Sequence, residues 1–218
     1  MSAFFKILFF SLFAAGSFGI ICWMFWEQEV KYMKPTIKPK GFIETASLGE
    51  IRSLAGFTTI DTNKPTMLHF FSSNCPCSRF NMREISHLAE KYGKQVNFIV
   101  VLQDRSAKSA NEFIEKYELD MHIVLDSLGT ISDFYGIYST PQTVLLNESE
   151  RIFYKGNYNK ARFCNSRKTA FADLAITSLL SNQQLPRFEQ QASMPYGCSL
   201  PSDDTSYPSF LSTINIFN

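Results

Sequence analysis

The sequence lacks an excess of charge of either sign. It contains 21 Lys and Arg residues against 20 Asp and Glu, for a formal net charge of +1. Proteins that bind nucleic acid through its backbone usually carry a clear basic excess, so we expect no nucleic-acid partner. The charged fraction of 19% and the apolar fraction of 45% are typical of globular proteins, which excludes wholesale disorder.

Cysteine and histidine are also scarce. The 218 residues include five cysteines and three histidines, too few for a small scaffold held together by disulfides. Only one pair of cysteines lies close in the sequence, whereas a structural zinc site usually needs two paired motifs, so we predict no metal site. No internal repeat is visible. The length fits one ordinary domain with appendages.

Phenylalanine is abundant, with 21 residues, and part of that excess lies in an uncharged run, Ile7–Trp26. As a helix this run would span about 30 Å, the thickness of the hydrocarbon core of a bilayer. Trp23 and Trp26 stand near its end, where aromatic rings favour the membrane interface. No small-x-small cleavage site ends the run, and the residue before Cys22 is too bulky for lipoprotein processing. We therefore predict an uncleaved anchor over residues 1–30 that contacts the lipid bilayer through residues 7–26.

The orientation of this anchor is less clear from the sequence. One lysine precedes the run, and four follow it in a Lys- and Pro-rich linker over residues 31–42. Counting Lys and Arg alone places the C-terminal side in the cytoplasm. The chemistry predicted for the domain favours the opposite side, the periplasm. Because Pro35 and Pro39 resist helix formation, we expect the linker to be an extended stalk.

Residues 43–181 alternate between strand and helix patterns, which indicates an α/β domain whose mixed sheet is flanked by helices. The last two predicted strands, which a polar turn joins, would form a hairpin and add an antiparallel edge to the sheet. The tail, residues 182–218, is rich in Gln, Ser, Pro and Asn and is expected to be irregular. The predicted strands are 66–71, 96–102, 121–125, 143–146 and 151–154, and the predicted helices are 46–55, 78–92, 107–117, 131–135 and 168–180.

Cys75 stands four residues after the first buried strand, at the start of a predicted helix. Unpaired backbone N–H groups and the positive end of the helix dipole favour a thiolate there, so we expect a lowered pKa and a reactive sulfur. Pro76 suits the first helical turn. Cys77 is close enough to attack a mixed disulfide on Cys75 or to form a strained, easily reduced bridge to it.

The segment Phe70–Ser78 (FFSSNCPCS) resembles the active site of thioredoxin-like proteins, in which a strand leads to a Cys-x-x-Cys pair. A second segment, Tyr135–Leu146 (YGIYSTPQTVLL), is similar to that superfamily's loop with a cis-proline. Together with the predicted anchor, the chain resembles the membrane-anchored thioredoxin-like proteins of bacterial envelopes, and its Cys-Pro-Cys-Ser motif resembles an uncharacterised branch of them. The resemblance implies a thioredoxin-like fold over roughly residues 57–181 and a thiol–disulfide oxidoreductase activity.

The resemblance also implies roles for single residues. Cys75 takes the position of the nucleophile, and Pro141 that of the cis-proline beside it. Thr140 would then pair its backbone with a bound substrate strand. His69 aligns with the buried acid that relays protons in related proteins, although a packed strand residue is the simpler interpretation. Ser78 replaces the usual resolving cysteine, so another thiol must do that work.

Four cysteines lie outside the apolar run and allow three complete pairings. The preferred scheme makes Cys75 and Cys77 the redox couple and pairs Cys164 with Cys198 as a staple for the tail. A rival scheme uses Cys164 to resolve a mixed disulfide on Cys75.

The sequence therefore predicts a membrane-tethered thiol–disulfide oxidoreductase of the inner membrane, with its domain in the periplasm. It would act on protein or small-molecule thiols and exchange electrons with an unidentified redox partner, and no bound cofactor is implied. One alternative is a Cu(I) metallochaperone that uses Cys75 and Cys77, with help from His69, His87 or His122. A non-catalytic interaction domain is the other.

Overall fold

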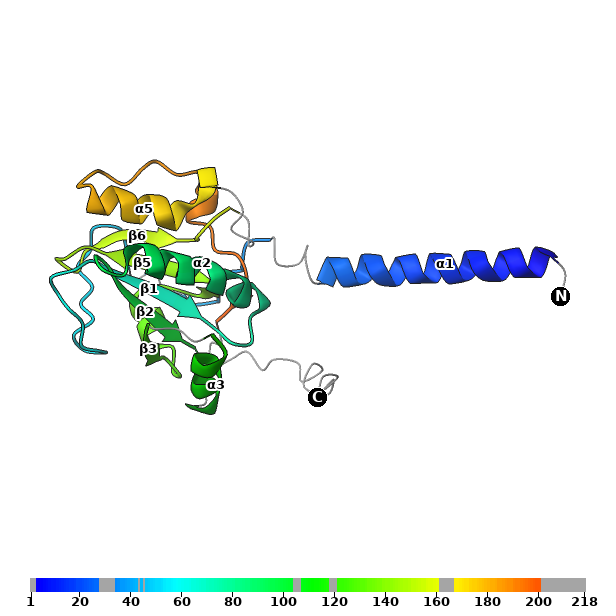
Figure 1. Ribbon diagram of the computed structural model, residues 1–218, viewed down its shortest axis with the longest axis horizontal. Coiled ribbons are helices and arrows are strands. Elements are labelled where there is room, and N and C mark those ends of the chain that lie inside the picture. The colour runs from blue at the N-terminus through cyan, green and yellow to red at the C-terminus, as the bar shows by residue number, and fades with distance from the viewer. Residues whose placement is uncertain are drawn as a thin grey trace.

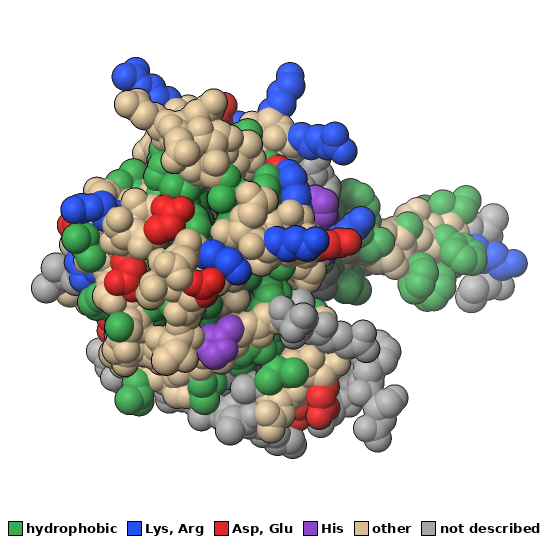
Figure 2. All heavy atoms as spheres, turned by 60° about the vertical axis from the view of Figure 1, so that its left-hand side comes forward, with side chains coloured by type: hydrophobic (Ala, Val, Ile, Leu, Met, Phe, Trp, Pro, Cys, Tyr) green, Lys and Arg blue, Asp and Glu red, His purple; other side chains and the backbone are tan. Residues whose placement is uncertain are grey.

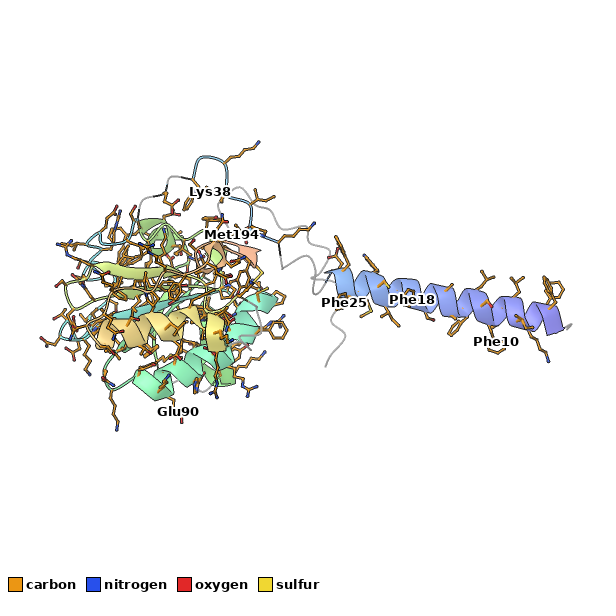
Figure 3. The ribbon with its side chains drawn as sticks, turned by 90° about the horizontal axis from the view of Figure 1, so that it is seen from above. Phe10, Phe18, Phe25, Lys38, Glu90 and Met194 are labelled. Carbon is orange, nitrogen blue, oxygen red and sulfur yellow. A yellow bond between two sulfur atoms is a disulfide. The ribbon has the colours of Figure 1, made fainter. Side chains whose placement is uncertain are left out.

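The computed structural model describes residues 3–27, 34–42, 44, 46–103, 107–117, 121–160 and 167–200 (Figure 1). Its first element is the helix α1, Ala3–Phe25, which is long and apolar enough to cross a membrane. None of the apolar stretch is buried against the rest of the described chain, and hydrophobic side chains cover the surface of α1 in Figure 2. In Figure 3 the labelled Phe10, Phe18 and Phe25 point outward from it. The helix fits a single-pass membrane anchor.

The domain is built on one five-stranded sheet with the strand order β3-β2-β1-β5-β6. The first three strands along the chain are parallel, and β5 and β6 form the antiparallel hairpin at the other edge. β1 is central and buried along its whole length, as its continuous apolar run requires. The strands of this sheet are β1, Thr66–Phe71; β2, Asn97–Leu102; β3, His122–Leu125; β5, Gln142–Leu146; and β6, Ile152–Gly156.

Helices cover both faces of the sheet, and each face has its own hydrophobic core. On one face, α2 and α5 pack on alternate strand residues through side chains such as Ile85, Leu88 and Ala175. On the other face, α4 packs with the chain that precedes β1, through Ile131, Tyr135 and Leu54. The helices are α2, Pro76–Tyr92; α3, Ala107–Tyr117; α4, Thr130–Phe134; and α5, Phe171–Leu180, with short 3₁₀ turns η3, Arg167–Thr169, and η4, Gln190–Ala192.

The helix predicted over residues 46–55 is wrong. Gly49 has a φ of +84°, outside the helical region, and its N–H donates to the carbonyl oxygen of Ile152 at 2.8 Å. Arg52 likewise donates its N–H to the Glu150 carbonyl. The segment therefore runs along the hairpin as an irregular edge, because its backbone finds partners on β6 that a helix would have to replace.

The tail and the linker both pack on the domain beside residues 139–140. Within the described tail, η4 buries Ala192, and the two-residue strand β7, Cys198–Ser199, pairs antiparallel with β4, Ser139–Thr140. The linker does more than space the domain from α1, because the N–H of Thr36 donates to the Pro195 carbonyl at 2.8 Å. In Figure 3, Lys38 of the linker and Met194 of the tail lie on the same side of the domain.

Candidate active site

Cys75 begins helix α2 directly after the loop that follows β1. It is the N-cap residue, with an extended backbone (φ −94°, ψ 115°), and Pro76 is the first helical residue. Its N–H donates to the Ser72 carbonyl at 3.1 Å, and its own carbonyl accepts from the N–H of Arg79 at 3.3 Å. No side chain caps this end of the helix. The positive end of the helix dipole therefore faces the sulfur and favours its thiolate form in the reduced protein.

The loop before β5 brings a cis-proline next to this sulfur. The peptide bond between Thr140 and Pro141 is cis, as the resemblance implied, and the Cys75 Sγ lies 3.4 Å from the Thr140 carbonyl oxygen. Thr140 is fully buried and sits in the short strand β4. The two segments that the sequence singled out, 65 residues apart, thus meet at one point.

Cys75 forms a disulfide with Cys198, across a sequence separation of 123 residues and a Cα–Cα distance of 5.8 Å. This bond differs from the predicted pairings of Cys75 with Cys77 and of Cys164 with Cys198. The tail folds back as β7 beside β4, which carries Cys198 to Cys75. A sequence pattern cannot reveal this long-range pairing in an irregular tail. Cys164 lies outside the described residues.

Cys77 is a buried thiol in the first turn of α2. Residues two apart on a helix do not face each other, which explains why the Cys75 sulfur has a different partner. The carbonyl of Cys77 accepts a hydrogen bond from the Asn81 side-chain amide at 3.3 Å. Asn81 is fully buried, and nothing in the sequence singled it out beyond its place one turn along the helix.

Ser78 occupies the position of the usual resolving cysteine. It is fully buried, and its hydroxyl accepts from the Ser72 N–H at 3.5 Å, across the loop that precedes α2. The side chain helps to shape the loop that presents Cys75.

His69 lies in the middle of β1 and is completely buried. Its Nδ1 shares a hydrogen bond of 2.6 Å with the Tyr158 hydroxyl. Burial lowers the pKa of His69 to about 3, so the imidazole is neutral at physiological pH. A group that does not titrate near neutral pH is a poor proton relay there. The burial of His69 therefore favours its interpretation as a packed residue of the strand.

The residues that hold the tail were not predicted. The side-chain amide of Asn157 donates to the carbonyls of Gln191 at 2.7 Å and Met194 at 2.6 Å. The Tyr196 hydroxyl donates to the Asn159 carbonyl at 2.8 Å. Both asparagines belong to the segment Gly156–Asn159 at the end of β6.

The described residues contain no cluster of three or more His, Cys, Asp or Glu side chains placed to hold a metal ion. His122, one of the ligands considered for copper, shares a hydrogen bond of 2.6 Å with the Thr58 hydroxyl on the β3 edge of the sheet. His69 is engaged with Tyr158. Neither histidine is joined to Cys75 in this arrangement.

Two curated relatives are thiol–disulfide oxidoreductases by name. The chain is 32% identical over 108 residues to thiol-disulfide oxidoreductase ResA of Halalkalibacterium halodurans, a match that covers 47% of this chain and 55% of the relative. It is 26% identical over 138 residues to sporulation thiol-disulfide oxidoreductase A of Bacillus subtilis, covering 62% of this chain and 80% of that one. The chain thus spans little more than half the length of the first relative.

A solved structure of similar fold is that of an uncharacterized conserved protein from Geobacillus kaustophilus. It superposes with a TM-score of 0.63 at 17% sequence identity and covers 79% of this chain and 99% of its own. The strand order, the cysteine at the start of α2 and the cis-proline before β5 make the fold thioredoxin-like.

One family model matches residues 48–199, which include the sheet, Cys75, the cis-proline and strand β7. The match covers most of the chain and reaches Cys198. The chain belongs to the thioredoxin-like superfamily and, within it, to the family described as a domain of unknown function, DUF6436.

Proposed function

We propose that the protein is a membrane-tethered thiol–disulfide oxidoreductase whose nucleophile is Cys75. The observation that carries this proposal is the position of the Cys75 sulfur, at the positive end of α2 and 3.4 Å from the carbonyl that precedes a cis-proline. Sulfur in this setting is stabilised as a thiolate, which is the form that attacks disulfides. The disulfide on Cys75 is the oxidised product of such chemistry.

Thr140 and Pro141 are proposed to dock an extended segment of the substrate. The cis bond turns the chain at Pro141, and the preceding strand β4 pairs with another strand along its edge. Backbone hydrogen bonds along such an edge hold a polypeptide regardless of most of its side chains. The substrate class is accordingly a protein or peptide with an exposed cysteine or disulfide.

The second thiol of the exchange is a separate question. The sequence favours Cys77, which would resolve a mixed disulfide on Cys75. Cys77 is fully buried within the helix. Its attack on a sulfur bound to Cys75 requires the first turn of α2 to open, because the two side chains leave the helix in different directions.

The domain is proposed to lie on the oxidising side of the inner membrane, with α1 as its anchor. A disulfide between two segments far apart in the sequence is expected to persist in the periplasm and to be reduced in the cytoplasm. Labelling of intact cells with a membrane-impermeant thiol reagent, after reduction, tests this placement. The placement is contradicted if Cys75 and Cys198 react only after the inner membrane is broken.

The activity is tested with the full chain in detergent, by reduction of a disulfide-linked peptide in the presence of a dithiol. We expect the Cys75→Ser variant to lose essentially all turnover, because it lacks the thiolate at the start of α2 that attacks the disulfide. The matched control is Cys22→Ser, which changes a cysteine of α1 that is exposed and far in sequence from the site. Full turnover by Cys75→Ser would refute the proposed function.

A further inference from the structure

The edge of β4, where a substrate strand is proposed to dock, is occupied by the chain itself. β7 pairs antiparallel with β4, with Thr140 opposite Cys198 and Ser139 opposite Ser199. The N–H of Leu200 extends this pairing by donating to the Tyr138 carbonyl at 3.0 Å. The Leu200 side chain is only 7% exposed and packs in the core beside α4. The tail segment Tyr196–Leu200 is thus bound along β4 as an added strand.

Gly197 lies directly against the cis-proline loop. Its φ is +123°, a conformation that residues with side chains rarely adopt. A Cβ at this position would overlap the Thr140 carbonyl oxygen and come within 3.2 Å of the Pro141 Cδ. Only glycine therefore fits directly before the cysteine that bonds to Cys75.

The linker holds the other side of the same strand. Pro35 forms an isolated antiparallel bridge with Tyr196, and the Thr36 N–H donates to the Pro195 carbonyl. The Thr36 hydroxyl also shares a hydrogen bond of 2.8 Å with the Ser139 hydroxyl of β4. Contacts on both sides thus position Cys198 on Cys75.

We propose that Tyr196–Leu200 is a built-in substrate strand and that Cys198 is the cysteine that resolves mixed disulfides on Cys75. The proposal rests on the proposed function, since it assigns the second thiol of that same reaction. An external substrate and the tail compete for one edge, so the tail leaves β4 when a substrate docks and returns to release it.

The exchange balances in two steps. First, the Cys75 thiolate attacks a substrate disulfide; a bond forms between the Cys75 sulfur and one substrate sulfur, and the other substrate sulfur leaves as a thiolate. Second, the Cys198 thiolate attacks the Cys75 sulfur; the bond seen in the structure forms, and the remaining substrate sulfur leaves as a thiolate. The substrate gains two electrons and takes two protons from water. An external dithiol then reduces the bond between Cys75 and Cys198 by the same exchange.

The geometry of the tail also defines the substrate class. The bound segment is extended, pairs through its backbone, and has glycine immediately before its cysteine. We therefore infer that the preferred substrates are polypeptides with an accessible Gly-Cys sequence in a strand or a flexible segment. A small thiol without a preceding backbone gains none of these contacts.

The role of Cys198 is tested in single turnovers of the reduced full chain. The probe is the peptide Tyr-Gly-Cys-Ser-Leu, activated as a mixed disulfide with thionitrobenzoate. Release of thionitrobenzoate reports attack by Cys75, and mass spectrometry follows the peptide bound to the enzyme. We expect Cys198→Ser to bind the peptide at the wild-type rate and to retain it, with release slowed at least about a hundredfold. Cys22→Ser is the matched control.

The outcomes separate the two proposals. If Cys75→Ser still binds and releases the peptide, the proposed function fails. If Cys75→Ser is inert but Cys198→Ser releases the peptide as fast as the wild type, only the inference about Cys198 fails. If Cys77→Ser retains the peptide while Cys198→Ser releases it normally, the inference about Cys198 is also overturned. Cys77 would then be the resolving cysteine.

A second experiment tests the strand itself and leaves every cysteine in place. Gly197→Ala is expected to slow release of the peptide at least about tenfold, because alanine disfavours the positive φ and its Cβ meets the Thr140 carbonyl. Gly56→Ala is the matched control, since a Cβ there meets nothing within 4 Å. The peptide Tyr-Ala-Cys-Ser-Leu should also bind at least about tenfold more slowly than its glycine counterpart. Equal rates for the two peptides, or normal release by Gly197→Ala, would contradict docking on β4.

Discussion

The bond between Cys75 and Cys198 should stabilise the domain strongly, and its removal is the most informative perturbation. The bond spans 123 residues of chain, and closing a loop of that size in the unfolded state is worth about 5 kcal/mol by the chain-entropy relation. Leu200 and Ala192 are buried by contacts other than the bond, so we expect the native tail to keep these contacts when the bond is broken. We therefore expect Cys198→Ser to lower the free energy of unfolding by about 5 kcal/mol relative to the oxidised wild type.

Urea denaturation of the full chain in detergent measures this loss. Both tryptophans of the protein lie within or directly after α1, so near-ultraviolet circular dichroism of the buried tyrosines follows the domain more faithfully than tryptophan fluorescence. With a urea dependence of about 2 kcal/mol per molar, the denaturation midpoint should fall by about 2.5 M in Cys198→Ser. Reduced wild type should match the variant, and oxidised Cys22→Ser should match the oxidised wild type.

Two results would refute this reasoning. One is an unchanged midpoint in Cys198→Ser, which would mean that the tail closes no covalent loop in solution. The other is an equal loss in Cys77→Ser, which would place the stabilising bond on Cys77.

Three further predictions concern the residues around the site. As the pH falls from 6 to 4.5, the free energy of unfolding should fall by about 1 kcal/mol per pH unit. The reason is that the unfolded chain protonates His69 near pH 6.5, whereas burial in the folded chain holds the pKa of His69 at about 3. His69→Gln should flatten this part of the pH profile, which urea denaturation measures. Asn157→Ala should cost about 2 kcal/mol and speed hydrogen exchange in the tail, since two carbonyls lose their donor, and unchanged exchange would contradict the proposed contacts. Leu88→Ala should cost about 3 kcal/mol by leaving a cavity under α2, whereas Leu128→Ala, at a side chain that is 88% exposed, should cost almost nothing in the same denaturation assay.

Much of the domain was predictable because its strongest signals are local. The apolar runs that became β1 and β2 needed burial on both faces, and each lies in the centre of the sheet. The run before residue 26 was long enough to form α1 in one piece. The segment over residues 46–55 misled because its apolar spacing resembled a helix, while Gly49 and the partners offered by β6 decided its backbone.

The active site was predictable only in part. Cys75 and Pro141 could be singled out because a helix start and a turn are each recognised from residues that are adjacent in the sequence. The disulfide partner of Cys75 could not be singled out, because Cys198 reaches it through pairing between two strands of two residues each. Such short strands leave no periodic pattern, and their position depends on Gly197, Thr36 and Asn157, which come from three distant segments.

A map of disulfides across a redox titration decides whether Cys75 and Cys198 form the redox couple. The full chain is equilibrated in buffers of reduced and oxidised dithiothreitol, its thiols are blocked, and the protein is digested without reduction for mass spectrometry. We expect one peptide pair, joined through Cys75 and Cys198, that appears and disappears reversibly in a two-electron transition. A reversible pair of Cys75 with Cys77, a stable pair of Cys164 with Cys198, or a Cys75 thiol that never oxidises would contradict it.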